Sequence, residues 1–390
     1  MNIKSVFVGA LLISHLSTSN GQTTSFTVSP AITLPKDITT QGPLLAALNA
    51  FLSQKDKPPK QNTYILKAHL LETSALLDEM KHVEENNDLK KPNFYRCYLT
   101  NVVPLNETDY LIQCSYLGIN ETTPVLRDSF TMLGAKDENQ FHFSSPLRQN
   151  SLSWKTEVLG NTTFHFKGSF NSVNAKTYLN KIAEYDKKLR APNQPTDFYC
   201  CDTFHEVLQL IGVDYKSDYN GYSHNTLSAF ENDTNLVIDG TVTSDFANFD
   251  PHDLWHDRLH KVLSPDIINR PVDEGCAYLY GGSWGLSWKE ILQKFKAYAA
   301  ANEKPDWLAL YNESRNFDEK ATHPLRADFA INALLVQKIE REKGFSAVME
   351  MLSCGKKETD NANYFKALEK ITGISKTSFS SSIVRLIKEN

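Results

Sequence analysis

The chain has 390 residues, of which 41% are hydrophobic and 22% are charged, and its formal net charge at pH 7 is −5. This length predicts about two domains, and the composition is that of an ordinary globular protein. The charges are scattered without a basic excess, so neither nucleic acid nor an anionic membrane surface is predicted as a partner. No stretch reaches the roughly 18 apolar residues that a membrane-spanning helix needs, so no membrane span is predicted.

The first 21 residues have the features of a signal peptide. Lys4 provides a positive start, Val6 to Ile13 form a short apolar run, and Ser19 and Gly21 are the small residues expected at a cleavage point. We therefore expect residues 1–21 to be removed and the protein to be secreted or periplasmic.

Export permits disulfides without requiring them. Cys97 and Cys114 lie on two apolar runs that flank a turn at Pro104–Asp109. If these runs pair as a hairpin, the two cysteines can face each other, and a bridge and two free thiols both remain open. The pairing of the six cysteines and the oligomeric state are not fixed by the sequence.

The segment after the signal peptide predicts little structure. Residues 22–60 are rich in Thr, Pro, Ser and Lys, and only Leu44–Leu52 has helical apolar spacing, so a linker with one short helix is predicted. Residues 64–85 repeat apolar side chains at i, i+3 and i+4, which predicts an amphipathic helix.

Short runs rich in aromatic and β-branched residues then recur across residues 93–172, with turn residues between them. This pattern predicts a meander of antiparallel strands. A charged helix is expected over 175–189, before a Pro-containing linker at 191–197. Residues 61–190 are therefore predicted to form an α+β accessory domain.

A second domain is predicted over residues 196–390. Its first elements are a short strand at 198–201, a helix at 203–211, and strands at 227–230 and 235–239. Beyond residue 287 the apolar spacing is mostly helical.

The segment that carries chemistry follows these strands. Asp250 suits a helix N-cap, and Ser264-Pro265 suits a helix end. Between them His252, His256 and His260 are spaced at i, i+4 and i+8, so they lie on one helix face. Two His one turn apart on a rigid helix can direct their imidazoles at one zinc ion.

After a short connection comes a second motif, the segment Glu274-Gly275-Cys276-Ala277-Tyr278. Together the two motifs resemble the gluzincin metallopeptidases, whose pattern is H-E-x-x-H on one helix and a Glu ligand within E-G-x-A-x-Y/F. The resemblance implies that His252, His256 and Glu274 bind Zn²⁺ and that the substrate is a peptide or protein.

The resemblance covers residues 198–390, about half of the chain. It implies an α+β fold in which an accessory domain precedes a zincin-like domain with a small mixed sheet, a metal-bearing helix and a C-terminal helical subdomain. It also implies that the strand at 235–239 is an exposed edge that holds extended peptide.

The position after the first His departs from the family pattern. The general base that takes a proton from zinc-bound water is Glu in the family, and here it is Asp253. Asp is one methylene shorter, a loss of about 1.5 Å in reach. Two readings follow: a peptidase that works with Asp253, or a non-catalytic binding or scaffold protein on the same fold.

Other residues are candidates for supporting roles. His323 and Tyr222 are candidates for stabilising an oxyanion, as a His or Tyr does in many zinc peptidases. Asp273 is a candidate for orienting a ligand His. An alternative H-D-x-x-H frame runs from His256 to His260, but its spacing to the Glu ligand fits the family less well.

Overall fold

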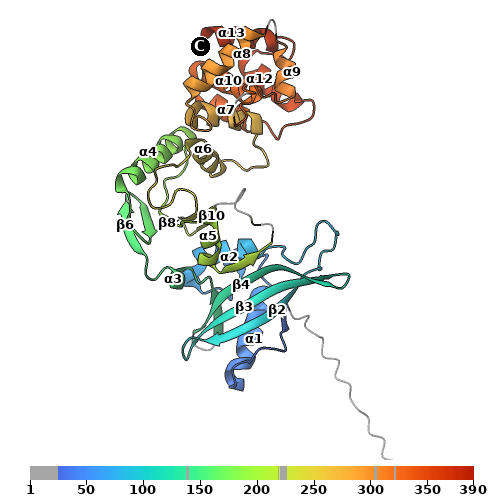
Figure 1. The fold of residues 1–390 in the computed structure, drawn as a ribbon, viewed down its shortest axis with the longest axis vertical. Coiled ribbons are helices and arrows are strands. Elements are labelled where there is room, and N and C mark those ends of the chain that lie inside the picture. Colours follow the sequence, from blue (N-terminus) through green and yellow to red (C-terminus); the bar gives the residue numbers. More distant parts are fainter. Residues whose placement is uncertain (1–24, 138–139, 218, 220–225, 303–304, 320–321) are drawn as a thin grey trace, which may run out of the picture. The chain divides into compact units, whose positions relative to one another are not determined.

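The structure is a computed structural model that describes residues 25–137, 140–217, 219, 226–302, 305–319 and 322–390. The protein is α+β, as predicted, and its chain divides into two compact units. One comprises Met1–Arg148 and Leu208–Tyr219, and the other comprises Gln149–Val207 and Asn220–Asn390. Tyr222 and the predicted signal peptide lie outside the described residues (Figure 1).

The first unit is built on a sheet with the strand order β1-β2-β3-β4-β5, and β9 also pairs with β4. Strands β2 to β5 form the predicted antiparallel meander, and alternate residues of β3 are buried, as a strand with one face on a core requires. The strands are β1 Thr27–Val28, β2 Arg96–Pro104, β3 Asp109–Asn120, β4 Thr123–Asp137, β5 Gln140–Ser144 and β9 Val213–Lys216.

The region predicted as a linker with one short helix at Leu44–Leu52 contains a longer helix in its described part. Helix α1 (Ile38–Leu52) packs on the sheet, with Leu44, Leu48 and Phe51 fully buried and the Phe51 ring 5.1 Å from the Phe143 ring. The polar composition belongs to the flanks, whereas the apolar face of the helix is core. The other helices of this region are η1 Pro59–Gln61, η2 Lys67–His69, α2 Leu70–Met80 and α3 Leu147–Asn150.

Cys97 and Cys114 lie on the paired strands β2 and β3, but they are not direct partners. Cys97 is opposite Tyr116, and Leu99 is opposite Cys114. Both thiols are buried and free, and they are hydrogen-bonded to each other.

The second unit contains a mixed sheet with the order β10-β11-β8-β7-β6. Strands β11, β8 and β7 are parallel, and each outer strand is antiparallel to its neighbour. The predicted edge strand, β11, is therefore an interior strand, because β10 covers its outer side. The strands are β6 Lys155–Leu159, β7 Thr162–Phe166, β8 Thr196–Cys200, β10 Thr226–Glu231 and β11 Thr234–Asp239.

The division between the units differs from the predicted boundary near 190–196. The β6–β7 hairpin and helix α4 (Ser172–Leu189) belong to the second unit, because β7 pairs in parallel with β8. An aromatic cluster joins these elements, with the Phe164 ring 5.4 Å from the rings of both Phe198 and Phe246. Helix α5 (Phe204–Ile211) crosses the division.

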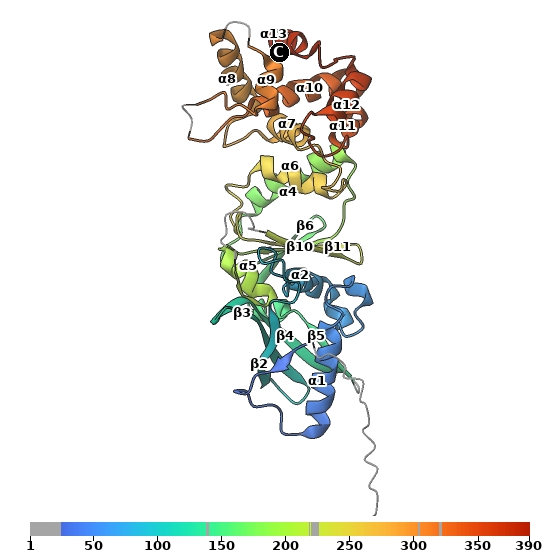
Figure 2. The ribbon, with the colours of Figure 1, turned by 90° about the vertical axis from the view of Figure 1, so that its right-hand side faces the viewer.

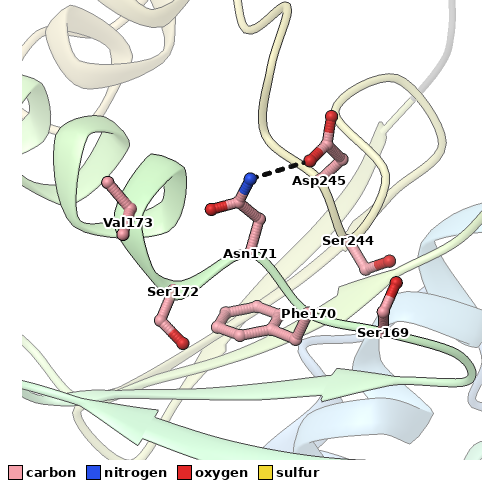
Figure 3. A pocket seen from close by; sticks show the side chains of 7 residues that line it. All are labelled: Ser169, Phe170, Asn171, Ser172, Val173, Ser244 and Asp245. Carbon is pink, nitrogen blue, oxygen red and sulfur yellow. Dashed lines mark hydrogen bonds between the residues drawn. The ribbon is translucent and has the colours of Figure 1, made fainter.

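Helix α4 begins beside a small hollow of about 450 Å³ (Figure 3). The Asn171 side chain accepts a hydrogen bond from Asn174 N at 3.1 Å and so caps the helix. Its amide also donates to Asp245 at 2.9 Å, which ties the start of α4 to the loop after β11.

The rest of the second unit is helical, as predicted, and Figures 1 and 2 show its helices clustered at the C-terminal end of the chain. The helices are α6 Pro251–His260, α7 Arg270–Gly281, α8 Trp288–Ala301, α9 Trp307–Asn312, α10 Ala327–Lys343, α11 Phe345–Leu352, α12 Ala362–Thr372 and α13 Phe379–Glu389. None of the helices in the described part of the chain has the length and apolarity that a membrane span needs.

Candidate metal centre

Helix α6 carries the first two candidate ligands. Asp250 is its N-cap and accepts a hydrogen bond from His252 N at 2.8 Å, and Pro251 occupies the first helical position. The helix ends at His260, earlier than the predicted stop at Ser264-Pro265. His252 and His256 lie one turn apart, and both are largely withdrawn from solvent.

Neighbouring side chains fix α6 in place. The fully buried Trp255 packs edge-on against Tyr185 of α4 at 5.4 Å. Arg258 makes two hydrogen bonds to the Asp186 carboxylate, at 2.6 and 2.9 Å. Because a bidentate Arg–carboxylate pair restrains both partners, the ligand-bearing helix has little freedom to rotate.

Helix α7 carries the third candidate ligand and depends on two glycines. A β-carbon at Gly275 would lie 2.5 Å from the Asn332 β-carbon, so this residue lets α7 approach α10 closely. A β-carbon at Gly281 would lie 2.6 Å from His252 N, so Gly281 lets the end of α7 lie against the start of α6. Gly275 thus has a packing role beside Glu274.

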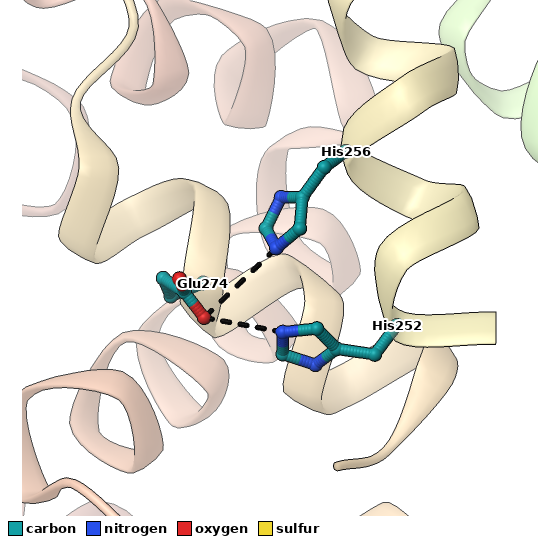
Figure 4. A group of neighbouring side chains, drawn as sticks. All are labelled: His252, His256 and Glu274. Atoms are coloured by element: carbon teal, nitrogen blue, oxygen red, sulfur yellow. Dashed lines mark ion pairs between the residues drawn. The ribbon is translucent and has the colours of Figure 1, made fainter. Parts of the chain in front are cut away.

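The three predicted ligands converge (Figure 4). Glu274 Oε2 lies 3.2 Å from His252 Nε2 and 4.0 Å from His256 Nε2. One ligand atom of each residue lies within 4.8 Å of the others. Metal bonds of roughly 2.0–2.1 Å would place neighbouring tetrahedral ligands about 3.3 Å apart. The His252–Glu274 separation already has this value, and His256 needs a small adjustment.

Both histidines are oriented through their other ring nitrogen. His252 Nδ1 donates to the Gly282 carbonyl at 2.7 Å, and His256 Nδ1 donates to Asp273 Oδ1 at 2.8 Å. A carbonyl and a carboxylate only accept, so each Nδ1 carries the proton and each Nε2 of a neutral ring has a free lone pair. This is the arrangement that metal-binding histidines adopt, and Asp273 contacts the candidate ligand His256.

The electrostatics favour a positive species between these groups. Burial lowers the pKa of His252, but hydrogen bonds to Glu274 and to the Gly282 carbonyl outweigh burial and leave that pKa raised. Burial raises the pKa of Glu274, but His252, His256 and Arg270 outweigh it and leave that pKa lowered. A proton and a metal ion would therefore compete for the His252 Nε2 lone pair.

Two contacts of the site were not predicted. One is the Gly282 carbonyl, a backbone group in the turn after α7 that carries no sequence signal. The other is Arg270, whose guanidinium lies 2.5 Å from Glu274 Oε1 and 3.1 Å from Asp273 Oδ2. Its spacing of three and four residues from these carboxylates on one helix was a readable signal.

The donor set suits a divalent metal ion. His256 Nε2 is buried and has no hydrogen-bond partner among the described residues, which is costly unless a ligand satisfies it. Two imidazoles and a carboxylate match the ligands of catalytic zinc, although two His and one carboxylate also suit Fe²⁺. The residues present thus fit a metal ion, and the identity of the ion is a separate matter.

The remaining predicted site residues are not part of this group. Asp253 follows His252 on α6 and is exposed to solvent. Partial desolvation of its carboxylate and then the negative charge of Asp250 raise its pKa. His323 is exposed and stacks on Trp284, with ring centroids 4.3 Å apart. Of the histidines on α6, the group includes His252 and His256, so the structure favours the first frame over the one that ends at His260.

The chain matches no known protein family in sequence, and it matches no curated protein.

Proposed function

We propose that this chain is a zinc-dependent peptidase with a gluzincin-like site, acting outside the cytoplasm, as its N-terminal segment predicts. The observation that supports the proposal is the convergence of two Nδ1-anchored imidazoles and one carboxylate on a common point. Zinc held in this way supplies a Lewis acid and lowers the pKa of a bound water.

Asp253 would serve as the proton carrier. Its carboxylate would accept a proton from the attacking water and return it to the leaving amine. Its shorter reach, compared with Glu, predicts slow turnover.

Extended substrate would pair with β10 rather than with the predicted strand at 235–239. Strand β10 is the outer strand on this side of the sheet, and Thr226, Ser228 and Phe230 are exposed along it. An edge strand presents unpaired backbone groups to which a peptide can add as a further strand.

A non-catalytic metal or peptide-binding protein is the second candidate. Two observations favour it: the Asp in place of Glu at 253, and the close contact between Arg270 and Glu274 Oε1. That contact engages one carboxylate oxygen of Glu274, and the positive charge of Arg270 partly offsets the negative charge of the carboxylate.

Hydrolysis of fluorescently labelled casein by the zinc-loaded protein separates the two candidates. A working enzyme is inhibited by 1,10-phenanthroline but not by the non-chelating 1,7 isomer, and Asp253→Asn abolishes its activity. Asp266→Asn is the matched control, because Asp266 is exposed and pairs with Lys356 away from the ligands.

The Asp253→Glu variant refines the result. If the native protein is inactive and Asp253→Glu hydrolyses casein, the native protein is an enzyme that has lost its activity. If the native protein is active and Asp253→Glu is not, the site is adapted to Asp. A protein that binds zinc but hydrolyses nothing, both as the native form and as Asp253→Glu, contradicts the peptidase proposal and supports the binding role.

A further inference from the structure

A larger cavity lies within the second unit, between the sheet and the helices α4 and α6. Its volume is about 1060 Å³, and side chains of both helices and of strands β10, β11 and β8 line it. Figure 2 shows α4 and α6 side by side over this sheet. Sites for small molecules commonly have volumes of roughly 300–1,000 Å³, so this cavity is large enough for a ligand.

The cavity and the metal group use opposite faces of α6. Leu254, Asp257 and Lys261 line the cavity, at positions i, i+3 and i+7. His252 and His256 lie on the other face, toward α7. A helix with 3.6 residues per turn separates these two sets by more than a quarter turn. The cavity is thus a separate feature of the same helix.

Two opposite charges in the cavity lack ion-pair partners among the described residues. Asp257 and Lys261 are both accessible to solvent, and Lys261 donates a 3.2 Å hydrogen bond to Asn235. Of the neighbouring charges, Arg258 pairs with Asp186, and Asp239 accepts hydrogen bonds from Thr226, Thr241 and Val242. Lys176, Lys187 and Arg190 also line the cavity and have no ion pair among the described residues.

Asp257 and Lys261 together suit a ligand that carries both a positive and a negative group. Residues four apart on a helix are about 6 Å apart along its axis. The ammonium and carboxylate groups of an extended dipeptide span up to about 7 Å. Tyr178, Leu179 and Leu254 add an apolar wall, which suits an aliphatic side chain.

We propose that this cavity binds a zwitterionic dipeptide with an apolar C-terminal side chain. Its ammonium group contacts Asp257, its carboxylate contacts Lys261, and its side chain packs on Tyr178, Leu179 and Leu254. Lys187 and Arg190 of α4, which also line the cavity, favour the carboxylate end. This ligand site is independent of zinc and of the proposed hydrolysis.

Calorimetric titration of the full chain with L-alanyl-L-leucine at pH 7.5 tests this assignment. The native protein is expected to bind it, and Asp257→Asn and Lys261→Met are each expected to weaken binding about tenfold or more, as the loss of a charged hydrogen bond does. N-acetylation of the dipeptide should mimic Asp257→Asn, and C-terminal amidation should mimic Lys261→Met.

Matched controls separate this site from the metal centre. Asp233→Asn and Lys289→Met change the same residue types at exposed positions outside the cavity and should leave affinity unchanged. Glu274→Ala with a chelator present should also bind the dipeptide normally. Absence of binding to the native protein, binding that survives both cavity variants, or binding that is lost in Glu274→Ala would each overturn the proposal.

Discussion

The two units bury ionisable groups in different ways. In the first unit, Cys97, Cys114 and Tyr116 sit among apolar side chains of β2 and β3. A hydrogen bond to Cys97 and then burial raise the pKa of Cys114, and burial and then Cys97 raise the pKa of Tyr116. Cys114 and Tyr116 therefore stay neutral near pH 7 and act as core.

In the second unit, partly buried histidines converge with a carboxylate. The two ligand histidines donate outward through Nδ1 and direct Nε2 at the Glu274 carboxylate. The comparison teaches that burial alone makes an ionisable group inert, whereas burial with convergence toward a shared point makes a candidate site.

Loss of a ligand carboxylate should have the largest effect. Glu274→Ala is expected to lower zinc affinity more than the roughly 100-fold that the loss of a residue supporting a ligand can cost. The control is Glu79→Ala in the first unit, which removes a buried carboxylate paired with Lys216 at 2.8 Å. Competition titrations with a zinc-sensitive dye measure both. Equal affinities in the two variants would contradict the assignment.

Loss of the supporting carboxylate should have a smaller effect. Asp273→Asn keeps the shape around His256 Nδ1 but removes the negative charge, so zinc affinity is expected to fall roughly 10–100-fold. Asp214→Asn in the first unit changes a carboxylate that accepts a hydrogen bond from Thr131 at 2.6 Å and should leave zinc affinity unchanged. An unchanged affinity in Asp273→Asn would show that His256 does not need this partner.

The close packing of α6 against α7 should contribute to the free energy of unfolding. Gly281→Ala places a β-carbon 2.6 Å from backbone His252 N, so we expect a loss of about 1–3 kcal/mol in the free energy of unfolding and weaker zinc binding. Gly42→Ala in α1 meets nothing within 4 Å and should stabilise by about 0.5–1 kcal/mol. Chemical denaturation distinguishes the two. Similar changes in both variants would refute the close approach of α6 and α7.

Competition between protons and zinc for His252 should have the smallest effect on zinc affinity. A protonated His252 cannot bind metal, and its raised pKa means that competition begins at a higher pH than for an ordinary His. Zinc affinity should therefore be constant at alkaline pH and fall about tenfold for each pH unit below that pKa. Titrations between pH 5.5 and 8.5 check this, and a constant affinity down to pH 5.5 would count against His252 as a ligand.

Local patterns predicted the elements and the ligand group better than the long-range arrangement. Helical spacing and the segment that begins at Glu274 were enough to predict that His252, His256 and Glu274 lie together, because α6 and α7 are consecutive. The edge position of β10 and the membership of the β6–β7 hairpin depend on strand pairing between distant segments. The Gly282 carbonyl depends on turn geometry, which no residue type encodes.

The most direct test is the metal content and coordination of the purified protein after it is loaded with zinc and dialysed. The account predicts one zinc ion per chain, with an X-ray absorption spectrum of two imidazole nitrogens and a carboxylate oxygen, and its loss in His256→Ala. Retention of the ion in His256→Ala, or no more than a trace of zinc in the native protein, would contradict the account.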